Sequence, residues 1–198
     1  MNANTKVFVG ALFGAIAGVV ISGILMCSVG FYVYKKEIAP FFAADEMEEG
    51  PIRTLEPPEF DKKSPVAAYD WKIVDLKGEE TSFSSFKNEV IFLNLWATWC
   101  PPCVSEMPTI QRLFEKVGDK VRIVCVSQED PGMVEKFAEA KKYGFPIYTL
   151  RGELPQAYKA DSIPASFIIN RKGEIVFSEV GSADWGHETA VDYFKSLL

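Results

Sequence analysis

The sequence predicts an α/β domain with a central sheet, preceded by one transmembrane helix, and three observations support this. Val90–Trp96 and Val121–Ser127 are short apolar runs, as expected of buried strands. Between them, apolar residues recur at helical spacing from Val104 to Val117. Val7–Tyr34 holds 28 residues without a charged side chain. The 198-residue chain is therefore expected to contain one folded domain behind an N-terminal extension.

After a short tail of residues 1–6, the segment 7–34 is predicted to span a membrane. It exceeds the roughly 20 apolar residues that cross a bilayer, and Lys6, Lys35 and Lys36 bracket it. A cleaved signal peptide is the alternative. The apolar run is about twice as long as the core of such a peptide, and no clear A-x-A cleavage site follows it. We therefore expect the segment to be retained as an anchor.

Small residues recur every four positions within this segment, at Gly10, Gly14 and Gly18. Such a face lets a second helix approach closely, so a homodimer through it is a hypothesis. The alternative is that glycine is simply common in membrane helices. Lysines at both ends of the segment leave its orientation undecided by charge alone.

Residues 35–65 are predicted to be an acidic, proline-containing linker. Within them, residues 37–62 carry eight acidic side chains against Arg53 and Lys62, which accounts for the whole net charge of −6. The remainder of the chain is thus neutral overall and offers no basic stripe for DNA or RNA. No nucleic-acid partner is expected.

The folded domain is predicted to cover residues 66–198 and to begin with a hairpin of Ile73–Leu76 and Thr81–Phe86. The first strand-to-helix unit follows, with Gly118 as the helix stop. Strands that alternate with helices predict parallel pairing, and a late hairpin adds antiparallel strands. The later elements, in order, are the strand Val121–Ser127, the helix Pro131–Tyr143 with Met133 and Val134 on its apolar face, the strand Ile147–Leu150, the hairpin strands Ser166–Asn170 and Glu174–Val180, and a last helix carrying Ala190, Val191 and Phe194.

Cys100 and Cys103 lie where the buried strand Val90–Trp96 meets the predicted helix. The positive end of the helix dipole stabilises a thiolate at Cys100, and Cys103 lies one turn inside the helix. We therefore expect Cys100 to be the attacking nucleophile and Cys103 to resolve the mixed disulfide, forming a Cys100–Cys103 disulfide. Pro101 and Pro102 have a structural role, because their fixed φ suits the first helical turn. The alternative is a pair of buried, inert cysteines.

No metal site and no cofactor are expected. The chain has one histidine, His187, so a zinc site would need ligands from another chain. His187 precedes the last helix and is expected to be solvated or to cap it. Cys125 is expected to be a small buried apolar residue, and the alternative is a third redox-active cysteine.

The segment from Asn94 to Pro108, NLWATWCPPCVSEMP, resembles the signature of the TlpA/ResA-type thioredoxin-like family. The resemblance extends over most of residues 70–198 and includes Ile163 and Pro164. It implies a thioredoxin-like fold, in which helices flank a central mixed β-sheet. It also implies thiol-disulfide oxidoreductase activity.

The resemblance assigns substrate contacts to Trp99, Ile163 and Pro164. Pro164 would be a cis-proline that faces the cysteines and presents backbone groups to an extended peptide. Ala165 stands where the family often has threonine, so contacts at that position are open. Trp99 is the tryptophan that borders the substrate surface, and packing alone is the alternative.

Glu106 is a candidate acid–base group for the resolving thiol, since it lies one helical turn after Cys103. The alternative is an exposed acid that stabilises the first turn of the helix. Asn94 occupies the position at which ordinary thioredoxins carry a buried aspartate, so Glu106 would replace that group. By the same resemblance, Pro108 is structural and kinks the helix.

The direction of electron flow is expected to be reductive. Pro101 and Pro102 offer neither a backbone N–H nor a charge to a Cys100 thiolate, which argues against a strong oxidant. The resemblance implies a single-pass protein of the bacterial cytoplasmic membrane, whose catalytic domain on the outer side reduces protein disulfides such as those of apocytochrome c. A membrane-embedded thiol carrier would supply the electrons.

Other functions stay open from the sequence. The same cysteines would serve a disulfide oxidase or isomerase, or a non-catalytic binding module with a structural disulfide. A peroxidase is disfavoured, because the residues before Cys100 do not form the Thr-x-x-Cys context and no arginine is close by in the sequence.

Overall fold

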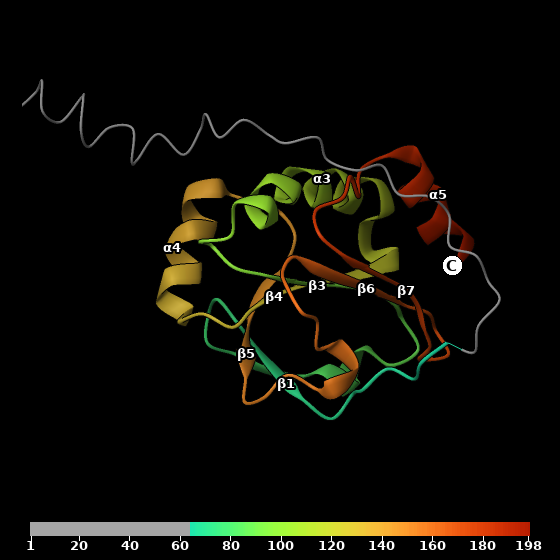
Figure 1. Cartoon of the computed structure of the whole chain (residues 1–198), viewed down its shortest axis with the longest axis horizontal. Helices are drawn as coiled ribbons and strands as arrows, with labels where there is room; N and C mark the ends of the chain where they lie inside the picture. The colour runs from blue at the N-terminus through green and yellow to red at the C-terminus, as the bar shows by residue number, and fades with distance from the viewer. Residues whose placement is uncertain (1–63) are drawn as a thin grey trace, which may run out of the picture. The chain divides into compact units, whose positions relative to one another are not determined.

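The computed structural model describes residues 64–198 of the chain (Figure 1). The predicted membrane segment 7–34, its glycine pattern and the linker up to residue 63 lie outside the described residues. Among residues 64–198, no helix combines the length and the apolar character needed to cross a bilayer.

One mixed sheet organises the described part of the chain (Figure 1). Its strands lie in the order β2-β1-β5-β4-β3-β6-β7. The pairs β3–β4 and β4–β5 are parallel, and the other neighbours are antiparallel. The strands are β1 (Lys72–Asp75), β2 (Glu80–Ser82), β3 (Val90–Trp96), β4 (Val121–Ser127), β5 (Ile147–Arg151), β6 (Ala165–Ile169) and β7 (Ile175–Val180).

β3 is the strand around which both cores form, and all seven of its residues are buried. Side chains alternate between the two faces of a strand, which explains its near-continuous apolar sequence. Val90, Phe92 and Trp96 pack on the helical face. Ile91, Leu93 and Leu95 pack on the opposite face.

The long helices α3 (Pro101–Val117), α4 (Pro131–Lys141) and α5 (Glu188–Ser196) lie on one side of the sheet (Figure 1). Their apolar faces join β3 and β4 in one core through residues such as Leu113, Val134 and Phe194. α3 ends at Gly118, whose φ of +56° is a conformation that glycine adopts without strain. Pro108 lies inside α3, where it removes one backbone hydrogen bond of the helix.

Short segments cover the other face of the sheet. Trp71 stacks on Phe83 with 4.5 Å between ring centroids, and Tyr158 packs edge-on to Phe83 at 6.0 Å. The Tyr158 hydroxyl donates a hydrogen bond of 2.9 Å to the carbonyl of Ala68. This aromatic cluster connects the residues before β1 to the 3₁₀ helix Gln156–Tyr158.

The predicted mixed α/β fold is confirmed, with two local differences. The second strand of the first hairpin ends at Ser82 and is followed by the 3₁₀ helix Phe83–Phe86. Phe83 and Phe86 are both buried, a three-residue spacing that a helical turn satisfies and an alternating strand does not. The prediction for Met133 was wrong: its side chain is 51% exposed, while its neighbour Val134 occupies the core.

Replacing Leu113 by Ala is expected to lower the free energy of unfolding by about 3 kcal/mol, because the side chain is fully buried and its loss leaves a cavity under α3. Urea titration would measure the change. Glu115→Ala, at an exposed position of the same helix, is the control and should change stability by less than about 0.5 kcal/mol. Equal effects of the two variants would contradict the assigned core face of α3.

Candidate active site

Cys100 and Cys103 form a disulfide with sulfurs 2.11 Å apart. Cys100 is the N-cap residue of α3, and its Sγ lies 3.3 Å from the backbone N of Cys103, which donates to it. The two cysteines are almost completely buried, with exposed fractions of 4% and 0%. Pro101 and Pro102 occupy the first turn of α3 and are exposed. The chain thus places the disulfide at the carboxyl end of β3 and the start of a helix, as the spacing predicts.

The Ile163–Pro164 peptide bond is cis, as the resemblance implies, and it lies against the disulfide. The carbonyl oxygen of Ile163 is 3.7 Å from Cys100 Sγ. The carbonyl of Pro164 accepts a 2.8 Å hydrogen bond from the backbone N of Gly181, at the end of β7. The start of β6 therefore holds the backbone of residue 163 at the cysteine pair.

The loop between β3 and Cys100 is fixed by a residue that the sequence did not single out. Glu129 accepts hydrogen bonds from the backbone N of Thr98, at 2.6 Å, and from its Oγ1, at 2.7 Å. Ser127 Oγ donates to the same carboxylate at 2.9 Å. Trp99, next to this clamp, is 69% exposed. An acid just after β4, at the carboxyl edge of the sheet, was the signal that could have identified Glu129.

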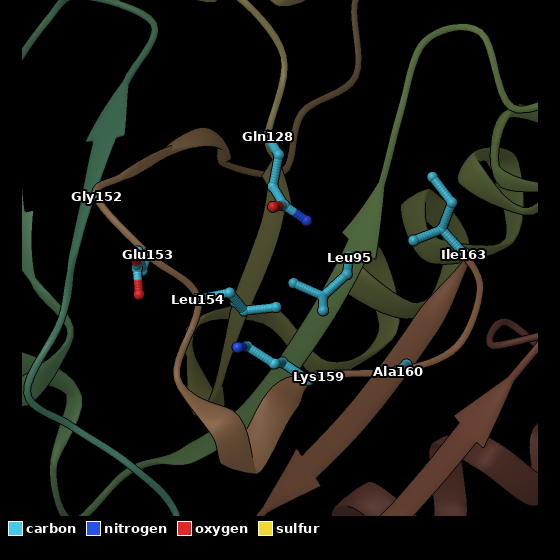
Figure 2. Close-up of a pocket in the computed structure, with 8 residues that line it drawn as sticks. All are labelled: Leu95, Gln128, Gly152, Glu153, Leu154, Lys159, Ala160 and Ile163. Carbon is cyan, nitrogen blue, oxygen red and sulfur yellow. The ribbon is translucent and has the colours of Figure 1, made fainter.

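A pocket of about 470 Å³ lies beside the loop that carries the cis-proline (Figure 2). It is bordered by Leu95 at the end of β3, by Gln128 after β4 and by Leu154, Lys159 and Ile163. Figure 2 shows these side chains around one opening. Because the carbonyl of Ile163 also contacts Cys100, the pocket adjoins the disulfide.

Glu106 is fully buried, so the alternative of an exposed acid at the helix start was wrong. Asn94 Nδ2 donates to its Oε1 at 2.8 Å, while the backbone N of Ala183 and Trp185 Nε1 donate to Oε2 at 3.2 and 3.1 Å. Burial raises the pKa of Glu106 from its usual 4.5 to about 7, and the three hydrogen bonds oppose this rise. A carboxyl group with such a pKa can hold or release a proton near neutral pH.

Asn94 links Glu106 to the strand that carries the cis-proline. Its Nδ2 also donates to Ser166 Oγ at 2.9 Å, and its Oδ1 has no hydrogen-bond partner. Ser166, Ala183 and Trp185 were not predicted as site residues, since they are 60 to 79 positions beyond Glu106 in the sequence and no local spacing connects them.

Cys125 is buried in β4, directly opposite Asn94 in the parallel β3–β4 pair. Burial, with a smaller contribution from Glu106, raises the pKa of Cys125 well above its usual 9.0. A thiol that resists ionisation and has no access to solvent is a poor nucleophile. These properties favour the interpretation of Cys125 as a small apolar residue.

Comparison with known proteins identifies the family of the chain. A family model described as Redoxin matches residues 58–196, which is more than half of the chain. The chain belongs to the TlpA/ResA-type thioredoxin-like family. Relatives in this family are named thiol-disulfide oxidoreductases, and with its Cys100–Cys103 pair the chain is one as well.

Individual relatives of the family resemble the chain to different extents. Thiol-disulfide oxidoreductase ResA of Geobacillus kaustophilus is 38% identical over 125 residues, covering 59% of this chain and 71% of that protein. ResA of Bacillus thuringiensis is 29% identical over 182 residues, covering 90% of this chain and 94% of that protein. The crystal structure of StoA from Bacillus subtilis superposes with a TM-score of 0.53 at 32% identity, covering 62% of this chain and 94% of that one.

The wild-type protein is expected to lose stability as the pH rises, and replacing Glu106 by Gln should remove this pH dependence. The folded state keeps the Glu106 proton up to about pH 7, whereas the unfolded state releases it near 4.5. Stability therefore falls as pH rises through this window, by on the order of 3 kcal/mol for a shift of this size. Urea unfolding of the oxidised protein at about pH 4 and about pH 8 would measure it. Identical pH dependence in wild type and variant would contradict a buried carboxyl with a raised pKa.

Proposed function

We propose that the protein is a membrane-anchored reductase of disulfides in extracytoplasmic proteins, for example during cytochrome c maturation. The observation that carries the reductive direction is the environment of Cys100. Its Sγ receives one backbone N–H, from Cys103, and lies 3.7 Å from the carbonyl oxygen of Ile163. In the reduced enzyme this carbonyl favours the thiol over the thiolate, because a carbonyl oxygen carries partial negative charge.

The reduction potential of the Cys100–Cys103 pair depends on how well the Cys100 thiolate is stabilised. A well-stabilised thiolate makes a disulfide a strong oxidant, and a poorly stabilised one makes the dithiol a good reductant. Pro101 and Pro102 add neither an N–H nor a charge near Cys100. The carboxyl group of Glu106, one helical turn after Cys103, further disfavours a second negative charge when it is ionised.

In the proposed reaction, the Cys100 thiolate attacks one sulfur of the substrate disulfide. The substrate S–S bond breaks, a mixed disulfide forms and one substrate thiolate leaves. Cys103 passes its proton to Glu106 and attacks Cys100 Sγ, which closes the enzyme disulfide and releases the second substrate thiolate. Two electrons thus pass to the substrate, and its two thiolates take up two protons. A membrane-embedded thiol carrier would then reduce the enzyme disulfide again.

The anchor and the location are inferred from the sequence before residue 64. Val7–Tyr34 is long enough to span a bilayer, and the acidic linker after it would hold the domain away from the membrane. The 182-residue similarity to ResA of Bacillus thuringiensis covers 90% of the chain and so includes part of this segment. We place the catalytic domain on the outer side of the cytoplasmic membrane, with the Gly10, Gly14 and Gly18 face as a contact for a homodimer.

The reduction potential of the full chain, equilibrated with glutathione or dithiothreitol buffers, tests the direction. We expect a value near that of thioredoxin, roughly −270 mV. A value near that of a strong periplasmic oxidant, roughly −120 mV, would overturn the reductase and favour disulfide formation with the same cysteines. Ile163 contacts Cys100 through its backbone carbonyl, so Ile163→Val is a control that should leave the potential unchanged.

Replacing Trp99 by Ala is expected to raise KM for a protein disulfide by about tenfold, as for a tryptophan at the centre of a contact surface. The rate with a small disulfide should not change, because the exposed ring supports no core. Val66→Ala is the matched control: Val66 is 78% exposed and pairs with Glu174, at the end of the sheet away from the cysteines. An unchanged KM in Trp99→Ala would remove Trp99 from the substrate surface.

A further inference from the structure

We propose that Trp185 is a positioning residue for thiol-disulfide exchange, because its indole N–H holds the carboxyl group of Glu106 that accepts the Cys103 proton. Trp185 lies in the loop between β7 and α5, far from the cysteines in sequence. The inference rests on the acid–base role of Glu106 in the proposed function.

The contact between Trp185 and Glu106 is direct and buried. Trp185 Nε1 donates to Glu106 Oε2 at 3.1 Å, and both side chains have no exposed surface. The backbone N of Ala183 donates to the same oxygen at 3.2 Å. One short loop therefore supplies both hydrogen bonds of Oε2, and Asn94 supplies that of Oε1.

The same loop is fastened to α3 one turn beyond Glu106. Thr109 Oγ1 accepts a hydrogen bond from the backbone N of Trp185 at 3.1 Å and lies 3.2 Å from the carbonyl oxygen of Ala183. Outside the core, Arg112 pairs with Asp184 at 2.9 Å. A side chain at Gly186 would come within 2.7 Å of Arg112 and 3.0 Å of the Thr109 carbonyl, so the loop needs glycine to approach α3 this closely.

The indole ring is held in place by aromatic neighbours. Its centroid is 4.6 Å from that of Phe92 on β3 and 6.1 Å from that of Phe177 on β7. These contacts leave the indole N–H aimed at Glu106. Trp185 therefore combines a packing role with a polar contact that no apolar residue could supply.

The surroundings of Glu106 make this hydrogen bond important for its protonation. Among titratable side chains, Cys125 on β4 interacts electrostatically with Glu106 and is held in the neutral form, and Cys103 lies one turn before Glu106 on α3. From β3 and the loop after β7, the facing groups are the uncharged Asn94 and Trp185. No described cation contacts the carboxylate among residues 64–198, so N–H donors alone offset the cost of burying its charge.

Removing the indole N–H changes the pKa of Glu106 in a predictable direction. The indole N–H stabilises the ionised carboxylate, so its loss favours the protonated acid and raises the pKa of Glu106. Glu106 then accepts the Cys103 proton only at higher pH. The loss of a hydrogen bond to a charged group corresponds to a pKa shift of about one unit.

The experiment follows the resolving step in the full chain with 5,5′-dithiobis(2-nitrobenzoate) as the probe disulfide. Cys100 of the reduced enzyme releases a first nitrothiobenzoate, and attack by Cys103 on the mixed disulfide releases a second. The rate of the second release is measured against pH. In Trp185→Phe the midpoint of this profile is expected to move up by about one unit.

Two matched variants separate positioning from packing. Phe177→Leu loosens the ring contact of Trp185 without touching its N–H, so the midpoint should stay at the wild-type value. Thr109→Val removes one attachment of the loop to α3 but leaves every donor to Glu106 in place, and a smaller upward shift is expected. A shift of equal size in Phe177→Leu would mean that packing, rather than the hydrogen bond, sets the midpoint, and would overturn the proposal.

The double variant Glu106→Gln/Trp185→Phe separates the acid–base role of Glu106 from the positioning role of Trp185. It should show no shift beyond that of Glu106→Gln alone. If Glu106→Gln leaves the wild-type profile intact, the acid–base role fails and the inference fails with it. If Glu106→Gln changes the profile and Trp185→Phe does not, only the positioning role of Trp185 is overturned.

A measurement on the wild-type sequence decides the matter if Trp185→Phe does not fold. The ¹⁵N–¹H signal of the Trp185 indole, assigned by selective labelling, should titrate with the same midpoint as the second release. The titration should vanish in Glu106→Gln. A signal that is insensitive to pH across that midpoint would overturn the proposal.

Discussion

A buried carboxyl group, Glu106, one helical turn after Cys103, is the constraint on which the rest of the site depends. Burying Glu106 would be costly without partners, and three N–H donors from two separate parts of the chain surround its oxygens. These hydrogen bonds require the β7–α5 loop to pack against α3 and Asn94 to be buried in the sheet. The same arrangement gives the carboxyl a pKa of about 7, so the contacts that stabilise the fold also support the proposed proton transfer.

The rest of the site is built on rigid elements at one edge of the sheet. Cys100 caps α3 where β3 ends, Glu129 clamps the preceding loop from the end of β4, and the cis-proline lies just before β6. The parallel strands β3 and β4 end at this edge and the antiparallel β6 starts there, which brings these groups together without long flexible loops. Trp99 is the large apolar side chain that reaches into solvent there.

The surroundings of Cys100 and the carboxyl group of Glu106 would affect different steps of the exchange. The backbone N–H of Cys103 stabilises a thiolate at Cys100, whereas the carbonyl of Ile163 disfavours it, and together they determine how easily this thiolate forms. In the proposed reaction, Glu106 acts on Cys103, the resolving thiol. Because a CxxC motif can run in either direction, the potential depends on these surroundings more than on the motif. A site in which a carbonyl faces the nucleophile and a carboxyl lies behind it suits a donor of electrons.

The sequence alone determined most of the strands and helices and the cysteine pair, because local spacing encodes them. Examples are the apolar run Val90–Trp96, the helical period after Cys103, and the two prolines at the helix start. It also placed Glu106 one turn from Cys103. Only the tertiary structure decided that Glu106 is buried, and that Trp185 and Glu129 complete the site. Those contacts join residues 31 to 79 positions apart, and no local pattern records which distant loops a fold will bring together.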